Sequence, residues 1–435
     1  MSAAVSRENW KDQARRLGYR SQCFIGNRFV SAVSGKTFTC TNPATGKPLT
    51  QVSAGGREDV DRAVRAARAA FDKGVWSRIA GAARGKVLFR LADLMEQHAT
   101  ELALLETLDT GKPIGDTSRV DVPLSIQCTR RYAEAIGGEP PGAVGVVVPW
   151  NFPLLTGSLA IGPVLAAGGS VVVKPAEQTP LSMLRLAELA AEAGVPAGVL
   201  NVIPGHGETA GEALRRHMGV DAIAFTGSAG CGGKALNIIM ADAPDLDAAA
   251  EAAAWGLFFT RDEVCNAGSR LLVEESVKDV VLEKIHKVAR ILQPGDPIDS
   301  MTRTGAMIDE VQMNRVLGYI EAGAREGARI AIGGKRVRAE TGGYYIEPTV
   351  FDGVKSSMKI AQEEIFGPVL SIISVRDEAE AVRIGNDTIH GLAAAVWTSD
   401  LDKASRMSQA LRAGVAWVNK PVTARRHPSP TCAPA

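Results

Sequence analysis

The chain has 435 residues, a length that predicts two or three domains. Hydrophobic residues make up 46 % and charged residues 22 %, the composition of a globular protein with a sizeable core. The 49 Lys and Arg residues almost balance the 48 Asp and Glu residues. The resulting net charge of +1 argues against a surface that binds nucleic acid or an anionic membrane.

The N-terminal segment and the cysteines favour a cytoplasmic protein without a membrane helix. The first 19 residues are polar and lack the apolar core of a signal peptide. Residues 140–173 carry no charge, but Pro149, Pro153 and Pro163 interrupt them, so we expect buried strands with a short helix. The six cysteines form no C-x-x-C pair, so neither a zinc site nor a disulfide framework is indicated, and a reducing compartment is expected.

The first third of the chain predicts short strands followed by helices. Alternating apolar residues punctuated by Gly, Asn and Pro predict strands within residues 22–53. Apolar residues spaced at i, i+3 and i+4 predict helices within residues 57–109 and 121–136.

The middle of the chain alternates apolar runs with helical segments. The runs lie at residues 143–148, 169–173, 198–203 and 221–225, and the helical segments at 157–167, 181–193 and 207–217. This alternation predicts a parallel, doubly wound α/β sheet, which binds ligands at the carboxyl ends of its strands.

The second half repeats this pattern. Strands are predicted at 271–273, 328–334, 344–351 and 369–375, and helices at 245–258, 275–292, 378–386 and 401–412. The composition changes at residues 419–435, which are rich in Pro, Ala and Arg and predict a disordered tail.

Polar or glycine-rich turns follow the strands of the middle region. Asn151 stands in PWNFP, where its amide could donate to a developing oxyanion or simply cap a turn. Lys174 and Glu177 follow the next strand and suit ribose hydroxyls or a phosphate, or else form a solvated loop. PGHGETAG and FTGS, with Gly227 and Ser228, follow the last two strands. Together these turns indicate a nucleotide site, although each alone is weak.

Two further segments carry candidate chemistry. Cys265 lies among the small residues of EVCNAGSR, which leave room for a thiolate nucleophile, although an inert buried cysteine has the same sequence context. EEIFGPVL joins two carboxylates to a Phe-Gly-Pro turn, so Glu364 could hold a ribose diol or lie in a surface turn.

These segments together resemble the NAD(P)-dependent aldehyde dehydrogenase superfamily. The matching runs are PWNFPLL, VVVKPAEQTPLS, GVLNVIPG, AIAFTGS, VCNAGSRLLVEES, EPTVF and EEIFGPVL, in the order of the family. LADLMEQHATELALLETLDTGKPI and LQPGDPID resemble bacterial enzymes for γ-glutamylated or amino aldehydes. The resemblance implies an α/β fold with a Rossmann-like cofactor domain over residues 1–233 and a catalytic domain over 234–418.

The resemblance also implies roles for individual residues. Cys265 is the expected nucleophile, and its backbone N–H forms an oxyanion hole with Asn151. The expected cofactor is NAD or NADP, held by Trp150, Lys174, Glu177, Gly227, Ser228, Glu364 and Phe366. The substrate is a small aldehyde, with an aminoaldehyde as the narrower expectation, and no metal is required.

Four departures from the family stand out. The position of its general-base glutamate falls on Gly230, followed by Cys231, as if a helix and a strand were missing after FTGS. The oligomerisation hairpin near residues 137–142 and the final strand are also missing, which predicts weakened or altered self-association. The family's N-Q-G-Q reads Thr-Arg-Asp-Glu at 260–263. Carboxylates there would raise the pKa of the Cys265 thiol, and Arg261 would lower it.

Several functions therefore stay open. The chain could be a working dehydrogenase with Glu263 as substitute base, or an enzyme that acylates Cys265 and deacylates slowly. It could transfer the acyl group to an external thiol. It could also be an inactive homologue with a binding role or a deletion product.

Overall fold

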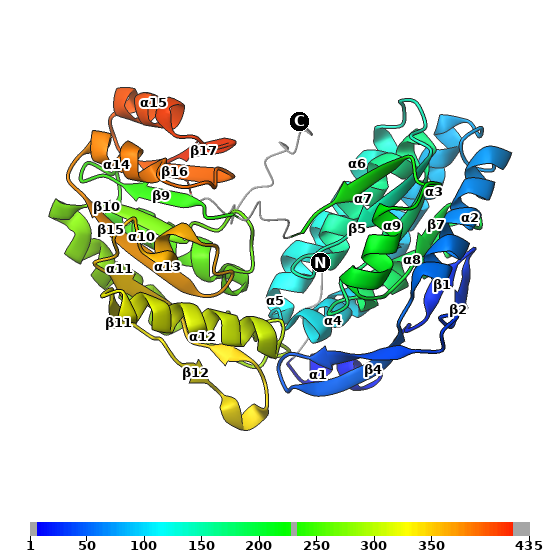
Figure 1. Cartoon of the computed structure of the whole chain (residues 1–435), viewed down its shortest axis with the longest axis horizontal. Helices are drawn as coiled ribbons and strands as arrows, with labels where there is room; N and C mark the ends of the chain where they lie inside the picture. Colours follow the sequence, from blue (N-terminus) through cyan, green and yellow to red (C-terminus); the bar gives the residue numbers. More distant parts are fainter. Residues whose placement is uncertain (1–6, 228–232, 421–435) are drawn as a thin grey trace. The chain divides into compact units, whose positions relative to one another are not determined.

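The computed structural model describes residues 7–227 and 233–420, with side chains from residue 10 onward (Figure 1). The chain divides into two compact units. The first runs to Gly227 and also takes in Asp296–Thr302 and Glu340–Gly343, and the remaining residues form the second. The assignment of a cofactor domain to 1–233 and a catalytic domain to 234–418 stays a prediction.

The first unit contains most of the N-terminal elements. Its strands are β1 (Cys23–Ile25), β2 (Arg28–Val30), β3 (Thr37–Asn42), β4 (Lys47–Ser53), β5 (Ala143–Val147), β6 (Ser170–Lys174), β7 (Leu200–Val202) and β8 (Ala222–Phe225). Its α-helices are α1 (Arg7–Arg15), α2 (Arg57–Lys73), α3 (Gly81–Gln97), α4 (Ala99–Thr110), α5 (Ile114–Asp116), α6 (Val122–Glu134), α7 (Pro153–Ala167), α8 (Leu181–Ala193) and α9 (Glu212–Arg215).

The main sheet of this unit has the order β2-β1-β7-β6-β5-β8, and β5 to β8 are parallel. Strand β6 shows why its sequence is uniformly apolar. Val171 and Val173 pack in one core cluster with α3, α7 and α8, whereas Val172 packs in another with α2 and α9. Both faces of the sheet are covered by helices, so the predicted doubly wound arrangement is confirmed.

The helix predicted at 157–167 is α7, which begins earlier, at Pro153, and continues through Pro163 to Ala167. A proline here removes the hydrogen bond to the carbonyl of Leu159. Leu159 is 37 % exposed, so this carbonyl lies on a turn that reaches solvent. The rest of α7 is packed in the core, which offsets the lost bond.

The second unit contains the C-terminal elements. Its strands are β9 (Leu236–Ile239), β10 (Arg270–Glu274), β11 (Arg329–Ile332), β12 (Arg336–Val337), β13 (Tyr345–Ile346), β14 (Thr349–Asp352), β15 (Val369–Val375), β16 (Ala393–Trp397) and β17 (Val415–Val418). Its α-helices are α10 (Leu246–Phe258), α11 (Lys278–Ile291), α12 (Glu310–Arg325), α13 (Lys359–Gln362), α14 (Glu378–Gly385) and α15 (Leu401–Ala410).

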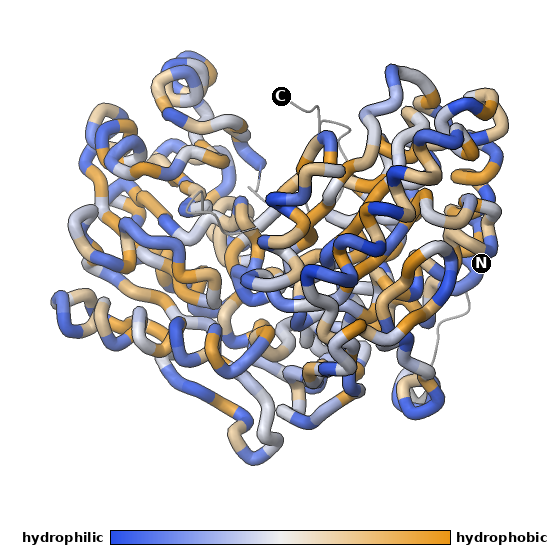
Figure 2. The backbone as a smooth tube through the Cα atoms, turned by 45° about the vertical axis from the view of Figure 1, so that its right-hand side comes forward, coloured by the Kyte–Doolittle hydropathy of each residue, from blue (hydrophilic) through white to orange (hydrophobic). Residues whose placement is uncertain are grey.

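The large sheet of this unit has the order β11-β14-β15-β10-β9-β16-β17, and β11 alone is antiparallel to its neighbour among the described strands. Leu271 and Val273 face the cluster with α10 and α11, and Leu272 faces the opposite cluster. In Figure 2 apolar stretches recur along the inner strands, while polar and apolar colours alternate along the helices. The predicted strand at 344–351 is two strands, β13 and β14, because Pro348 cannot donate to a ladder between them.

Two strands end these sheets with little cover. Strand β8 is mostly exposed, and Phe225 is 53 % exposed. Strand β17 ends the second sheet, and Val415 is 48 % exposed. Residues 135–142 connect α6 to β5 without a strand. Among the described residues, none of the helices is both long and apolar enough to span a bilayer.

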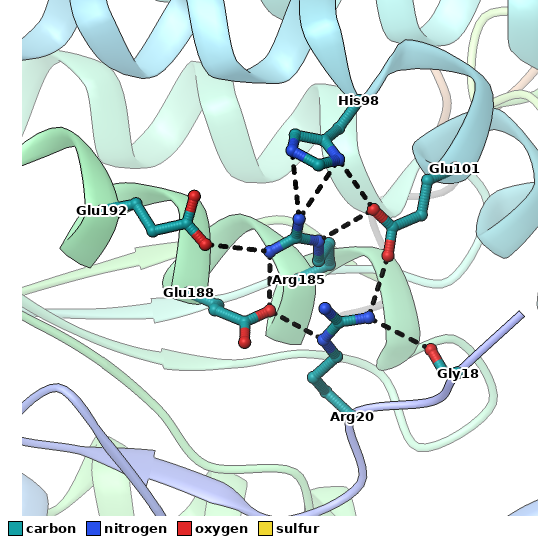
Figure 3. A network of polar contacts seen from close by, with 7 residues as sticks. All are labelled: Gly18, Arg20, His98, Glu101, Arg185, Glu188 and Glu192. Atoms are coloured by element: carbon teal, nitrogen blue, oxygen red, sulfur yellow. Dashed lines mark hydrogen bonds and ion pairs between the residues drawn. The ribbon is translucent and has the colours of Figure 1, made fainter.

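A network of charged side chains ties helices of the first unit together (Figure 3). Arg185 of α8 has a side chain that is only 4 % exposed, and it contacts carboxylates from two helices. Its Nε lies 3.0 Å from Glu101 of α4, and its Nη1 lies 2.6 Å from Glu188. Arg20 bridges the same two glutamates at 2.8 and 2.7 Å and so anchors the segment before β1.

Replacing Arg185 by Met should therefore destabilise the first unit. Glu101 and Glu188 would lose a shared cation, at a cost of about 2–3 kcal/mol, somewhat below that of breaking a fully buried pair because both keep some solvent. Chemical denaturation followed by circular dichroism measures this loss. Arg376→Met is the control, because Arg376 pairs with Glu380 at the surface and should leave the midpoint nearly unchanged.

Candidate functional site

The turn with Asn151 lies at the carboxyl end of β5. Strand β5 ends at Val147, and α7 begins at Pro153, so Trp150 and Asn151 stand between a parallel strand and a helix. Asn151 is 7 % exposed and Trp150 is partly exposed. This is the edge at which doubly wound sheets bind ligands.

Lys174 ends the neighbouring strand, opposite Val147 in the β5–β6 register. Its ammonium lies 2.7 Å from the carboxylate of Glu177. Burial opposes ionisation of Glu177, but Lys174 outweighs it and holds the pKa of this carboxyl below its usual value, with a smaller contribution from His206. At neutral pH Glu177 is thus a carboxylate that can accept hydrogen bonds from a diol.

The glycine-rich turn follows β7 as a π-helical turn over Gly207–Gly211. A Cβ atom at Gly211 would lie 4.0 Å from the Lys174 side chain, and one at Gly207 would meet nothing within 4 Å. The open backbone, the ammonium and the carboxylate together fit the hydroxyls of a nucleotide ribose.

The turn after β8 is the predicted binding segment for the pyrophosphate of a dinucleotide. Gly227 is described, whereas Ser228, Gly230 and Cys231 lie outside the described residues. Between Gly233 and Asp245 no helix begins, and α10 starts at Leu246. The described part of the chain therefore fits the ribose groups of NAD or NADP but offers no helix N-terminus after β8 for the pyrophosphate.

Cys265 lies in the second unit, between a 3₁₀ turn at Phe259–Asp262 and β10. The residue is exposed. A Cβ atom at Gly233 would overlap the carbonyl oxygen of Cys265, so only glycine allows this close approach of two backbones. The Gly233 N–H donates to the carboxylate of Glu364 at 2.9 Å. Gly233 thus connects the candidate nucleophile with the EEIFGPVL turn.

The surroundings of Cys265 disfavour its thiolate. Desolvation raises its pKa, the Glu364 carboxylate raises it further, and the N–H groups of Asn266 and Cys265 only partly oppose this. The carboxylate that acts on the thiol is Glu364, so the expectation that the charges at 261–263 set its pKa is wrong.

The charges at 261–263 are instead paired with other groups. Arg261 forms an ion pair with Glu263, and both side chains are almost fully buried. The second carboxylate oxygen of Glu263 accepts the N–H of Ile308 at 3.0 Å. Burial raises the pKa of Glu263 to about 7, against the pull of Arg261. Thr260, Arg261 and Asp262 have φ values of 47°, 65° and 60°, a left-handed run that costs these residues backbone strain.

The EEIFGPVL turn is held by helix α12. Gln312 donates to the carbonyl oxygen of Phe366 at 2.8 Å, and Arg315 donates to that of Glu364 at 3.0 Å. Phe366 has a φ of 57° and is partly exposed. Burial raises the pKa of the Glu364 carboxyl, and the Gly233 N–H opposes that shift.

Sequence reasoning missed Lys234, which follows Gly233 directly. It is 1 % exposed, and its ammonium has no hydrogen-bond partner among the described atoms. Burial lowers its pKa to about 8, although Asp262 and Glu364 favour the charged form. No pattern in the sequence indicated that the Lys234 side chain is buried, because the residues that surround it in the fold come from distant segments.

The predicted site residues thus fall into two groups. The first unit brings together Trp150, Asn151, Lys174 and Glu177 at one sheet edge. The second unit brings together Cys265, Glu364 and Phe366. In the described part of the chain, no group of three or more His, Cys, Asp or Glu side chains is arranged to hold a metal ion.

Comparison with known proteins gives the class of this chain. The sequence model of the aldehyde dehydrogenase family matches residues 29–431. The NADP/NAD-dependent aldehyde dehydrogenase PuuC of Escherichia coli is 44 % identical, over 94 % of this chain and 90 % of the relative. The aminoacetaldehyde dehydrogenase of Pseudomonas aeruginosa is 42 % identical, over 96 % of this chain and 91 % of the relative.

A solved structure agrees with these relatives. The aldehyde dehydrogenase KauB from Pseudomonas aeruginosa superposes with a TM-score of 0.94 at 48 % identity, covering 96 % of this chain and 92 % of that one. The chain belongs to the aldehyde dehydrogenase family. The predicted family, its α/β fold and its oxidoreductase class are confirmed, with NAD or NADP as the cofactor of this class.

The pH dependence of Cys265 alkylation tests the electrostatics of this site. Replacing Glu364 by Gln removes a negative charge beside the thiol, so the pKa of Cys265 should fall. The rate of iodoacetamide alkylation at pH 8 should then rise about 3- to 10-fold. Glu363→Gln is the matched control, because Glu363 accepts from the Tyr319 hydroxyl and its charge does not act on the thiol. An equal rise in both variants would contradict the role of Glu364.

Proposed function

We propose that this chain oxidises an aldehyde to a carboxylate through a thioester on Cys265. The observation that carries the proposal is the exposed thiol of Cys265, set among small residues with Gly233 and Glu364 beside it. Membership in the aldehyde dehydrogenase family supports it.

In the first step the Cys265 thiolate attacks the aldehyde carbon. The C–S bond forms as the carbonyl π electrons move to oxygen. Asn151 and the Cys265 N–H donate to that oxyanion, a type of interaction that contributes a large share of the rate in acyl chemistry. Lys174 and Glu177 bind ribose hydroxyls, and Glu364 binds the second ribose.

In the second step the oxyanion reforms the carbonyl and a hydride leaves the carbon, which produces the thioester. NAD or NADP, when bound, supplies the hydride acceptor. Water then attacks the thioester, the C–S bond breaks, and the carboxylate is released. That last step needs a base to take a proton from the water.

We infer that this last step is slow in this chain. The family's base would fall on Gly230, which has no side chain that could accept a proton. Glu263 is a poor substitute, because one of its oxygens binds Arg261 and the other binds the Ile308 N–H. Loss of a general base costs about 10²- to 10⁴-fold in rate.

We infer an aminoaldehyde as the substrate class and altered self-association. A similar protein, the aminoacetaldehyde dehydrogenase of Pseudomonas aeruginosa, supports the substrate class together with the 91–114 segment. The strandless connection at residues 135–142 supports altered association. A stable tetramer in gel filtration at micromolar concentration would contradict the second inference.

A rapid-mixing assay tests the proposed reaction. With NAD⁺ and a simple aminoaldehyde, we expect a burst of about one NADH per chain, followed by turnover about 10²- to 10⁴-fold slower. Cys265→Ala should abolish the burst, and Cys128→Ala, which changes a buried cysteine of α6, should retain it. A wild-type chain without a burst would favour the inactive homologue, and turnover as fast as the burst would exclude slow deacylation.

The lifetime of the acyl-enzyme identifies the step that limits turnover. Intact-mass spectrometry after the burst should detect the acyl group on Cys265. Glu263→Gln should leave its lifetime unchanged, within about 2-fold, because both oxygens of Glu263 are already engaged. A much longer lifetime in this variant would make Glu263 the base. A lifetime shortened by coenzyme A would favour acyl transfer to an external thiol.

A further inference from the structure

Helix α7 begins without a cap of its own. The residue before its first turn is Phe152, whose side chain has no oxygen, and Pro153 occupies the first helical position. The N–H of Leu154 is one of the orphan donors that every helix N-terminus leaves. Only Phe152 separates this helix from Asn151. Contacts that hold the first turn of α7 therefore also fix the turn that carries Asn151.

A carboxylate from another helix supplies the missing cap. Glu106 of α4 is 0 % exposed, and its Oε1 accepts the Leu154 N–H at 2.7 Å. The same oxygen accepts the Ser182 hydroxyl at 3.3 Å. A negative charge at this end of a helix also interacts favourably with the helix dipole.

A second buried charge holds the other side of the turn. The ammonium of Lys112 lies 3.4 Å from the centroid of the Phe152 ring. It also donates to Asp121 at 2.6 Å, and both side chains are 0 % exposed. A cation over an aromatic ring is attracted to its face, the more so where water is excluded.

We propose that Glu106 and Lys112 are positioning residues that fix the Pro149–Pro153 turn and thereby aim Asn151 at the oxyanion of the reaction. The proposal rests on the proposed function above, because it assigns Asn151 its role. Buried charges are costly, and an apolar pair could pack against α7 as well. Here Lys112 contacts Phe152 and Glu106 contacts Leu154, so both charges hold the segment that follows Asn151 and set its geometry rather than general stability.

The charges around Glu106 give this arrangement a pH dependence. Asp109 of α4, Lys112 after it, Asp121 before α6 and Ser182 of α8 all face Glu106. Burial and Asp121 raise the pKa of Glu106 to about 7, against Lys112 and the Leu154 N–H. The cap is therefore a carboxylate above pH 7 and a weaker, neutral acceptor below it. The raised pKa stabilises the fold at low pH, and that contribution is lost as pH rises through 7.

Two variants test the proposal with the full chain. Glu106→Gln keeps the shape of the cap and removes its charge. The double variant Lys112→Met with Asp121→Asn removes the cation from Phe152 without leaving the Asp121 carboxylate buried beside an apolar side chain. Arg185→Met is the control for stability alone, because its ion pairs lie with Glu101 and Glu188 rather than with this turn.

The readouts separate positioning from stability. At saturating aldehyde the burst rate should fall about 10-fold in both test variants, a fraction of the effect of losing an oxyanion donor. Alkylation of Cys265, which needs no oxyanion hole, should change less than about 2-fold. In the wild type, the ratio of burst rate to alkylation rate should fall below pH 7, and Glu106→Gln should flatten this profile. Amide hydrogen exchange should rise in residues 149–156 of both variants.

Three results would overturn the proposal. They are a burst rate no lower than in Arg185→Met, a parallel fall of burst and alkylation, and unchanged exchange in residues 149–156. A wild type without any burst contradicts the proposed function instead. Exchange then decides alone whether Glu106 and Lys112 hold the turn, since it does not depend on activity.

Discussion

The register between β5 and β6 is the constraint on which the candidate site of the first unit depends. Because Val147 lies opposite Lys174, the two strands end at the same level, and the turns that follow them start side by side. Strand β7 pairs with β6 so that its last residue, Val202, lies opposite Val173. The glycine turn after β7 therefore starts at the same edge of the sheet. Parallel pairing thus brings Asn151, in the turn after β5, to the same sheet edge as Lys174 and Glu177, at the end of β6 and in the turn after it.

The sequence predicted the bounds of an element correctly where its residues are uniformly apolar or strongly periodic. The apolar run at β6 and the periodic α8 were predicted almost to the residue, because a strand covered on both faces admits little else. Strand β16 escaped prediction because AAAVW is alanine-rich and has weak strand propensity. Helix α7 was predicted to begin at residue 157 but begins at Pro153, because a proline is tolerated at the first helical position.

The candidate site was predictable residue by residue, but its electrostatics were not. Cys265 and Glu364 each stood in a recognisable motif, whereas only the fold shows that Gly233 lies between them. Arg261 and Glu263 are close to the nucleophile in sequence, and proximity suggested that they act on the thiol. The left-handed backbone at 260–262 turns them toward each other and toward Ile308 instead. A prediction from spacing cannot anticipate such a run of positive φ in residues that disfavour it.

The buried charges are the physical argument for the proposed slow deacylation. In the proposed mechanism acylation uses the Cys265 thiol and the Asn151 amide. Deacylation also needs a carboxylate that water can reach. The described carboxylates of the catalytic segment are committed elsewhere: Glu263 to Arg261, and Glu364 to the Gly233 N–H. Asp262 is buried, and burial raises the pKa of its carboxyl well above the usual value. In the proposed mechanism thioester formation therefore depends on groups that backbone turns position, whereas hydrolysis depends on one side chain.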